Sequence, residues 1–148
     1  VYHFAVRALD EAGNVGALST VVSAKTNPVA PATIVDLAAV VLAGSTVELR
    51  WTAPGDDGQV GTATSYEVRH APSSLTAQTF ALATKVATPP KPAVAGTKQT
   101  LTVTGLAPGR THRFAIVTRD EENNASYLSN VAVAVTAPET PQKKSQSH

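Results

Sequence analysis

Hydrophobic and polar residues alternate over several short stretches of the chain, which is the period of a β-strand with one buried face. In the stretch 47–52, Val47, Leu49 and Trp51 are expected to face a core, while the residues between them face water. Other stretches show the same alternation or are rich in β-branched residues, which favour strands. The strands predicted in this way are 47–52, 66–70, 100–104, 114–118 and 131–136.

Turn-forming residues separate these strands. Runs of Pro, Gly, Asp and Ser interrupt the pattern at 54–58, 71–74, 89–92 and 107–109. Two further segments, 38–42 and 76–86, have a composition that also suits a short helix, but their Val, Thr and Phe content favours strands. Many short strands without a long amphipathic helix predict an all-β fold, an antiparallel β-sandwich.

The sequence contains an internal repeat. Residues 1–26 align with 111–136 at an offset of 110, with ten identities and no gap. Each copy reads as a strand, an Asp-Glu-x-x-Asn loop and a second strand, which is the closing hairpin of a repeated unit. Residues 111–136 would therefore close a complete unit that begins near Pro31, and residues 1–26 would close a preceding unit.

The repeat predicts the organisation of the chain. We expect a partial unit at 1–26, a proline-containing linker at 27–31, a complete domain at 31–137 and a flexible polar tail at 138–148. Since the chain has no methionine, we expect it to be a piece of something longer. A lone hairpin is marginally stable, so residues 1–26 are expected to pack against neighbouring domains of the parent chain or an adjacent subunit.

The motifs resemble a fibronectin type III domain, of the kind found in tandem in secreted and surface proteins of bacteria. The resemblance covers 31–137 in full and 1–26 as a final hairpin. The residues that carry it are Pro31 to Leu37 at strand A, 47–51 on strand B, 53–58 in the B–C loop, 66–69 on strand C, 102–109 before strand F at Phe114, and 119–121 with 128–130 around the F–G loop. It implies an immunoglobulin-like sandwich of about seven strands and leaves the function open.

A hydrophobic core follows from the alternation and the resemblance. The expected core residues are Trp51, Tyr66, Val68, Leu106, His112 and Phe114. The family usually has a tyrosine two residues before Phe114, where this chain has His112, and Tyr2 takes that place in the first copy. We expect His112 to make a weaker corner hydrogen bond, and we hypothesise that this bond depends on pH. His70 and His112 are expected to approach each other as a structural pair, rather than as a metal site.

Composition excludes several classes of function. The net charge is +1, from 12 basic and 11 acidic residues, so no strong field attracts nucleic acid. The absence of cysteine excludes disulfides, zinc–thiolate sites and a thiol nucleophile. No apolar stretch approaches the roughly 18 residues of a membrane span, so we expect no membrane insertion. Neither a Gly-x-Ser-x-Gly elbow nor a phosphate-binding loop is present, so we predict no catalytic residue and no cofactor.

Two loops carry candidate binding residues. Asp56 and Asp57 are weak candidates for a metal site, although Asp-Gly turn chemistry explains them more simply. The F–G loop supplies the interaction candidates, which are Asp120, Glu121, Glu122, Asn123, Asn124 and Tyr127. A structural turn is the default interpretation of this loop. Contact with a polysaccharide or protein ligand is the alternative, because loops at sandwich ends often bind.

The sequence thus favours a non-catalytic extracellular module, a stiff spacer repeat and interaction surface of a larger secreted or surface protein. Two alternatives stay open. The chain could be an accessory module of a secreted hydrolase that acts on polysaccharide or protein. It could also be a subunit of a filament, sheath or nicked assembly that is held together by β-strand complementation through residues 1–26.

Overall fold

The computed structural model describes residues 2–24 and 29–141, and parts of the predicted linker and tail lie outside these ranges. The strands are β1 (Tyr2–Phe4), β2 (Val22–Ala24), β3 (Ala38–Ala43), β4 (Thr46–Thr52), β5 (Ser65–Ala71), β6 (Thr84–Lys85), β7 (Lys98–Val103), β8 (Thr111–Arg119) and β9 (Ala132–Val135). One short 3₁₀ helix, η1, spans Phe80–Leu82. No helix of the described residues is long and apolar enough to cross a membrane.

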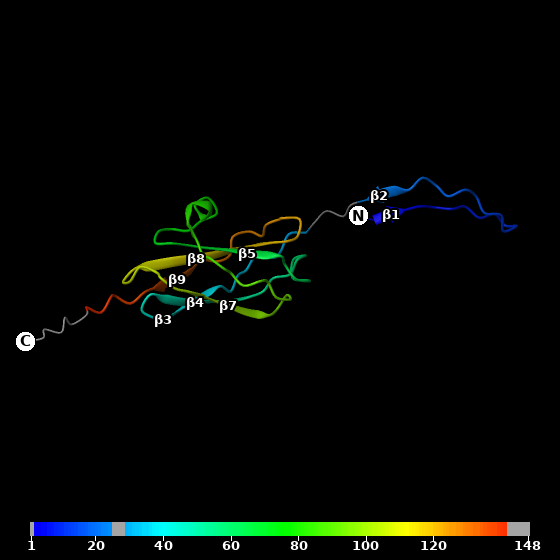
Figure 1. The fold of residues 1–148 in the computed structure, drawn as a ribbon. Coiled ribbons are helices and arrows are strands. Elements are labelled where there is room, and N and C mark those ends of the chain that lie inside the picture. The colour runs from blue at the N-terminus through cyan, green and yellow to red at the C-terminus, as the bar shows by residue number, and fades with distance from the viewer. Residues whose placement is uncertain (1, 25–28, 142–148) are drawn as a thin grey trace, which may run out of the picture.

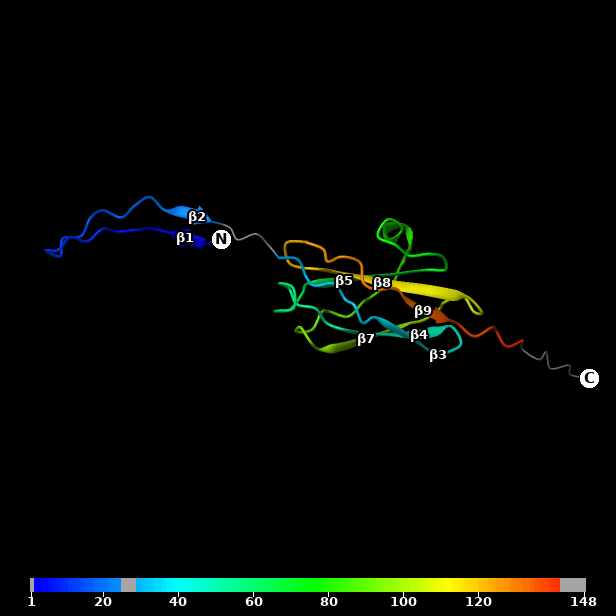
Figure 2. The ribbon, with the colours of Figure 1, turned by 180° about the vertical axis from the view of Figure 1, so that it is seen from behind.

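Seven strands form a sandwich of two antiparallel sheets (Figure 1). One sheet has the order β3-β4-β7 and the other has the order β6-β5-β8-β9. The two layers lie face to face in both views of the ribbon (Figure 2). The predicted all-β antiparallel sandwich is therefore confirmed.

The core lies between the sheets, where the alternation placed it. Val47, Leu49 and Trp51 on β4 are buried, and the Trp51 ring meets the Tyr66 ring edge-on, with centroids 5.3 Å apart. The residues predicted for the core are all buried: Trp51, Tyr66, Val68, Leu106, His112 and Phe114. Each large apolar side chain buried in this way contributes about 1.5–3 kcal/mol through removal from water. The sheets are thus held together mainly by apolar contacts from β4, β5 and β8.

The segment that contains β6 differs from the prediction. Residues 76–86 were expected to form a strand, but they contain η1 and only the two-residue strand β6. The reason is local hydrogen bonding: the Thr79 hydroxyl accepts from the Thr76 N–H at 2.9 Å, and the Phe80 N–H donates to the Thr76 carbonyl at 2.8 Å. These turn bonds use backbone groups that a strand would offer to its neighbour.

The turn places Phe80 on the outer face of the four-stranded sheet. There Phe80 forms a second, smaller apolar cluster with Leu75, Ala115 and Val117. Strand β8 is consequently buried on both faces, which explains its continuous apolar run from Phe114 to Val117.

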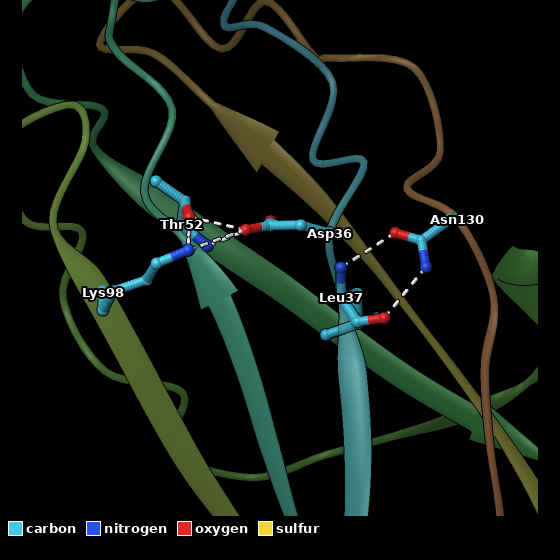
Figure 3. A network of polar contacts seen from close by, with 5 residues as sticks. All are labelled: Asp36, Leu37, Thr52, Lys98 and Asn130. Carbon is cyan, nitrogen blue, oxygen red and sulfur yellow. Dashed lines mark hydrogen bonds and ion pairs between the residues drawn. The ribbon is translucent and has the colours of Figure 1, made fainter.

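The predicted strand A begins later than expected. Residues 31–37 do not form a strand, and Pro31 makes only an isolated bridge with Gly58 before β3 starts at Ala38. Side chains hold this segment instead, as Figure 3 shows. The Asn130 amide accepts from the Leu37 N–H and donates to the Leu37 carbonyl, both at 2.9 Å. This pair of bonds, the Asn130 clasp, ties the F–G loop to the start of the opposite sheet.

A second polar group secures the other side of the same segment. The Asp36 carboxylate accepts from the Thr52 N–H at 3.0 Å and lies 3.2 Å from the Lys98 ammonium (Figure 3). Partial burial would raise the pKa of Asp36, but the hydrogen bonds from Thr52 and the charge of Lys98 outweigh it, so the pKa lies below its usual range. The start of β3 is therefore fixed to residues of both other strands of its sheet, Thr52 on β4 and Lys98 on β7.

The E–F corner is closed by an imidazole. The His112 Nε2–H donates to the Ala107 carbonyl at 3.0 Å, and the Thr136 hydroxyl donates to the same oxygen at 2.6 Å. The predicted hydrogen bond of His112 is thus present, and a threonine from the end of β9 reinforces it. The His70 ring lies beside it, with centroids 5.6 Å apart, as expected for neighbouring strands.

The N-terminal hairpin of β1 and β2 does not bury its apolar side chains. Its apolar side chains are exposed, whereas their counterparts in the complete domain are buried: Phe4 is 58% exposed and Phe114 0%, and Val6 is 73% exposed and Ile116 1%. Both ribbon views show the hairpin clear of the two sheets (Figures 1 and 2). The hairpin therefore presents a core-forming face that is uncovered in this chain.

Replacing the clasp residue tests its contribution. Asn130→Asp keeps an acceptor for the Leu37 N–H but loses the donor for the Leu37 carbonyl. Asn130→Ala loses both. We expect Asn130→Asp to lower the free energy of unfolding by about 1 kcal/mol and Asn130→Ala by about 2 kcal/mol, measured by urea denaturation. Equal stability of both variants and the parent chain would contradict this role.

The histidine pair predicts acid sensitivity. Burial lowers the pKa of His70 below its ordinary value of 6.5, and the neighbouring His112 lowers it further. Because the folded-state pKa is depressed, stability is complete above pH 6.5 and is lost as the pH falls towards the folded-state value. We expect the free energy of unfolding to decrease between pH 7.5 and pH 5, and His70→Gln to reduce that loss. If His70→Gln left the loss between pH 7.5 and pH 5 unchanged, titration of His70 would not be the cause.

Candidate functional site

The candidate site lies at the end of the sandwich where the B–C loop (53–64) and the F–G loop (120–131) come together. The F–G loop starts with a compact turn around Asp120. One oxygen of its carboxylate accepts from the Glu122 and Asn124 N–H groups at 3.0 and 2.8 Å, and the other accepts from the Asn124 amide at 2.8 Å. Asn123 adopts a positive φ of 66°, which asparagine tolerates better than most residues.

The hairpin repeats this turn. The Asp10 carboxylate accepts from the Ala12 and Asn14 N–H groups at 3.0 and 2.7 Å and from the Asn14 amide at 2.8 Å. Gly13, with a φ of 82°, takes the place of Asn123. Since the same bonds form in both copies, Asp and Asn at these two positions build the turn.

The turn leaves Asp120 unsuited to bind a ligand. Asp120 is only 6% exposed, and its carboxylate already accepts three hydrogen bonds. Burial would raise the pKa of Asp120, but the bonds from Asn124 and Glu122 outweigh it and lower the pKa. Glu121, Glu122, Asn123 and Tyr127 are exposed, and Asn124 is half-buried. The interaction candidates therefore divide into two groups, a structural pair and an exposed set.

The B–C loop brings Asp56 and Asp57 to the same end of the sandwich. Its backbone folds tightly: the Asp56 N–H donates to the Val60 carbonyl at 2.8 Å, and a Cβ on Gly55 would lie 2.1 Å from that oxygen. Only glycine fits at position 55, because any side chain would overlap the backbone of Val60. The Pro-Gly-Asp-Asp-Gly sequence thus specifies the loop that carries both carboxylates.

The two loops meet through their acidic residues. Burial raises the pKa of Asp56, and a hydrogen bond with Glu121 raises it further, followed by the charges of Glu121, Asp57 and Asp120. The sequence placed Asp56 and Glu121 in two separate candidate sites, and only the fold brings the two loops together. In the described part of the chain, no group of three or more His, Cys, Asp or Glu side chains is arranged to hold a metal ion. Burial and the neighbouring acidic groups therefore disfavour the ionised form of Asp56.

A groove of about 340 Å³ opens beside the F–G loop on the outer face of the four-stranded sheet. Phe80, Val117 and Leu128 supply its apolar lining, and Glu67 and Arg119 contribute the charged groups. Tyr127, at 86% exposed, stands at its margin. Tyr127 was an expected interaction residue, but the groove was not expected, because one of its walls is η1, where a strand was predicted.

Ion pairs hold the charged side of the groove in place. The Glu67 carboxylate lies 2.6 Å from Arg69 Nε and 3.7 Å from the Arg119 guanidinium. Arg69 also donates to the Ala81 and Ala83 carbonyls at 2.9 Å, and its guanidinium carbon lies 5.5 Å from the centre of the Phe80 ring. Arg69 therefore fixes η1 and Glu67 to each other, which makes the groove a preformed feature.

A family model described as fibronectin type III domain matches residues 30–134. Chitinase A1 of Niallia circulans is 32% identical over 145 residues, a match that covers 94% of this chain and 18% of that protein. A match that covers 94% of the 148 residues must include some of residues 1–26. The similarity therefore extends into the N-terminal segment. The chain spans less than a fifth of the length of this relative.

Solved structures show the same fold at low sequence identity. The FN1–FN3 domains of chicken CNTN1 match with a TM-score of 0.52 and 16% identity, over 73% of this chain and 33% of that one. Consecutive domains of titin match with a TM-score of 0.53 and 20% identity, over 84% of this chain and 38% of that one. At these identities the comparison shows the fold alone.

The meeting of the acidic loops predicts a pH-dependent gain from one substitution. Because the folded-state pKa of Asp56 is raised, its stabilising contribution is present below the ordinary value of 3.8 and is lost as the pH rises through the folded-state pKa. Asp56→Asn removes the charge at neutral pH. We expect a higher melting temperature than that of the parent chain at pH 7 and no difference below pH 3.8, measured by circular dichroism. Asp57→Asn, on the exposed neighbour, is the matched control and should change the melting temperature less.

Proposed function

Because the chain belongs to the fibronectin type III family, we propose that it is a non-catalytic module of a larger secreted enzyme that degrades a polysaccharide. In this proposal the complete domain is a stiff spacer in a tandem array, and hydrolysis takes place elsewhere in the parent polypeptide. The proposed units are those read from the repeat: a partial domain at 1–26, a linker at 27–31, a complete domain at 31–137 and a tail at 138–148.

The geometry of the two ends of the domain is the observation that carries this proposal. The chain reaches the sandwich at the B–C loop, where Pro31 pairs with Gly58. It leaves at the E–F corner, where the Gly109 N–H donates to the Ala137 carbonyl at 3.0 Å. These two loops lie at opposite ends of the sandwich (Figure 1). Repeats joined in this way follow one another end to end, so that each adds its full length to the separation of its neighbours.

The similarity to Chitinase A1 supports the choice of parent. It runs from part of the N-terminal segment into the complete domain, so the relative contains a comparable succession. That relative is named for the hydrolysis of chitin, while the chain corresponds to 18% of its length. Chitin is an insoluble polymer that an enzyme must meet outside the cell, which supports an extracellular location. A module that separates a catalytic domain from a substrate-attached domain suits such a substrate.

The hairpin fits the same arrangement. Three of its exposed apolar residues, Phe4, Val6 and Val22, align with the buried Phe114, Ile116 and Ala132 of the complete domain, so they suit the missing strands of a sandwich of this family. In the parent polypeptide those strands would come from the preceding part of the same repeat. Complementation by an adjacent subunit is the second possibility, and it would make the chain part of an assembly.

Domain replacement in the parent enzyme tests the spacer function. Three variants are compared with the intact enzyme: deletion of 31–137, replacement by a Gly-Ser linker of equal residue number, and replacement by a heterologous fibronectin type III domain. A Gly-Ser chain is flexible, so it does not hold its two ends at a fixed separation and orientation. Hydrolysis of insoluble chitin should fall several-fold after deletion and after Gly-Ser replacement, and the heterologous domain should restore most of it.

A soluble chitooligosaccharide is the control substrate, and all variants should cleave it at the same rate. If deletion leaves the hydrolysis of insoluble chitin unchanged, the spacer function is wrong. If deletion also abolishes the cleavage of soluble oligosaccharide, the module takes part in catalysis and the proposal is wrong in that respect.

A further inference from the structure

We propose that the groove beside Tyr127 binds a chain of β-1,4-linked N-acetylglucosamine, with the tyrosine ring as a platform for one sugar. The choice of sugar depends on the proposed function, because it takes the substrate of the parent enzyme as the occupant. The groove itself is argued from residues of this chain. It would give the spacer a weak hold on the polymer along which it lies.

Tyr127 is not explained by the fold. Its side chain is 86% exposed, and the aligned position of the first copy is Ala17. The next residues agree between the copies, since Leu128 and Ser129 align with Leu18 and Ser19. The two copies thus share the residues that anchor the loop and differ at the exposed position.

The other groove residues also distinguish the two copies. Arg119 aligns with Leu9 and Val117 with Arg7, so the first copy lacks both the cation and the apolar floor at these positions. Tyr127, Arg119 and Val117 occur together in the complete domain, where they line one groove. This joint difference points to a feature of this repeat that the turn and core do not require.

The lining suits a pyranose that carries an acetamide group. One face of such a ring consists of C–H groups, which pack on an aromatic ring, and its hydroxyls lie around the edge. Phe80 and Val117 are each 8% exposed, and with Leu128 they form an apolar floor for the acetamide methyl. The volume of about 340 Å³ lies within the range of small-ligand sites.

The charged groups of the groove favour a neutral, hydroxyl-rich ligand. Glu67 and Arg119 are the charged residues of its lining, and their formal charges cancel. The Glu67 carboxylate can accept from a sugar hydroxyl, and the Arg119 guanidinium has more N–H donors than its contacts with Glu67 and the Asn123 carbonyl use. A polymer of N-acetylglucosamine is uncharged and offers both donors and acceptors.

Titration of the isotope-labelled 148-residue chain with chitohexaose tests the groove. We expect chemical-shift changes at Tyr127, Arg119 and Ala81 and a dissociation constant that Tyr127→Ala raises about tenfold or more. Tyr127→Phe keeps the ring and should bind like the parent chain. Val35→Ala, at an exposed site outside the groove, is the matched control and should leave the affinity unchanged. Cellohexaose, which lacks the acetamide groups, should bind more weakly.

Several outcomes would overturn the inference. These are equal affinities of the parent chain and Tyr127→Ala, shift changes confined to other surfaces, or equal affinities for the two hexasaccharides. Light scattering adds a further case: if Tyr127→Ala converts a dimer to a monomer, the groove is an interface between copies. If chitohexaose does not bind but the heterologous domain fully restores the hydrolysis of insoluble chitin, this inference is wrong and the spacer function stands. If chitohexaose binds but deletion of 31–137 leaves the hydrolysis of insoluble chitin unchanged, the spacer function is wrong and this inference stands.

Discussion

The contact of Trp51 on β4 with Tyr66 on β5 joins the two sheets, and the remaining structure depends on it. Apolar packing between the layers fixes how β4 and β5 lie relative to each other. The B–C loop runs between these two strands, and β8 lies beside β5, so the same packing determines where the B–C and F–G loops end. The polar contacts at the periphery, including the Asn130 clasp and the corner at His112, then secure a geometry that burial has already set.

The two copies of the closing hairpin separate local from tertiary causes. The Asp-x-x-x-Asn turn has nearly the same hydrogen-bond distances around Asp10, in a hairpin with exposed apolar residues, as around Asp120, in the complete domain. The turn is therefore determined by its own short sequence. The exposure of Phe4 and Phe114 differs completely, because burial requires the other strands. A repeat in one chain thus serves as an internal control for which features need the core.

This distinction also explains what could be predicted from the sequence. Alternation gave β4, β5 and β7 with the correct inward faces, because a period of two depends only on neighbouring residues. The two turns followed from the repeat for the same reason. The groove and the proximity of Asp56 and Glu121 could not be predicted, since each requires the relative position of segments far apart in sequence. The continuous strand predicted at 76–86 is absent because Thr76 and Thr79 form hydrogen bonds within a turn. That turn creates a wall of the groove.

The opposite positions of the two ends of the domain also have a mechanical meaning. Strands β3 and β9 both begin beside the Asn130 clasp and run in the same direction, away from the end where residue 31 enters the sandwich. Tension on the flanking segments therefore pulls the first strand backwards and the last strand forwards, which loads them in shear along their length. In shear, several hydrogen bonds must break together, whereas peeling breaks them one after another. The opposite placement of the two ends would therefore also let the domain resist forces that are applied through them.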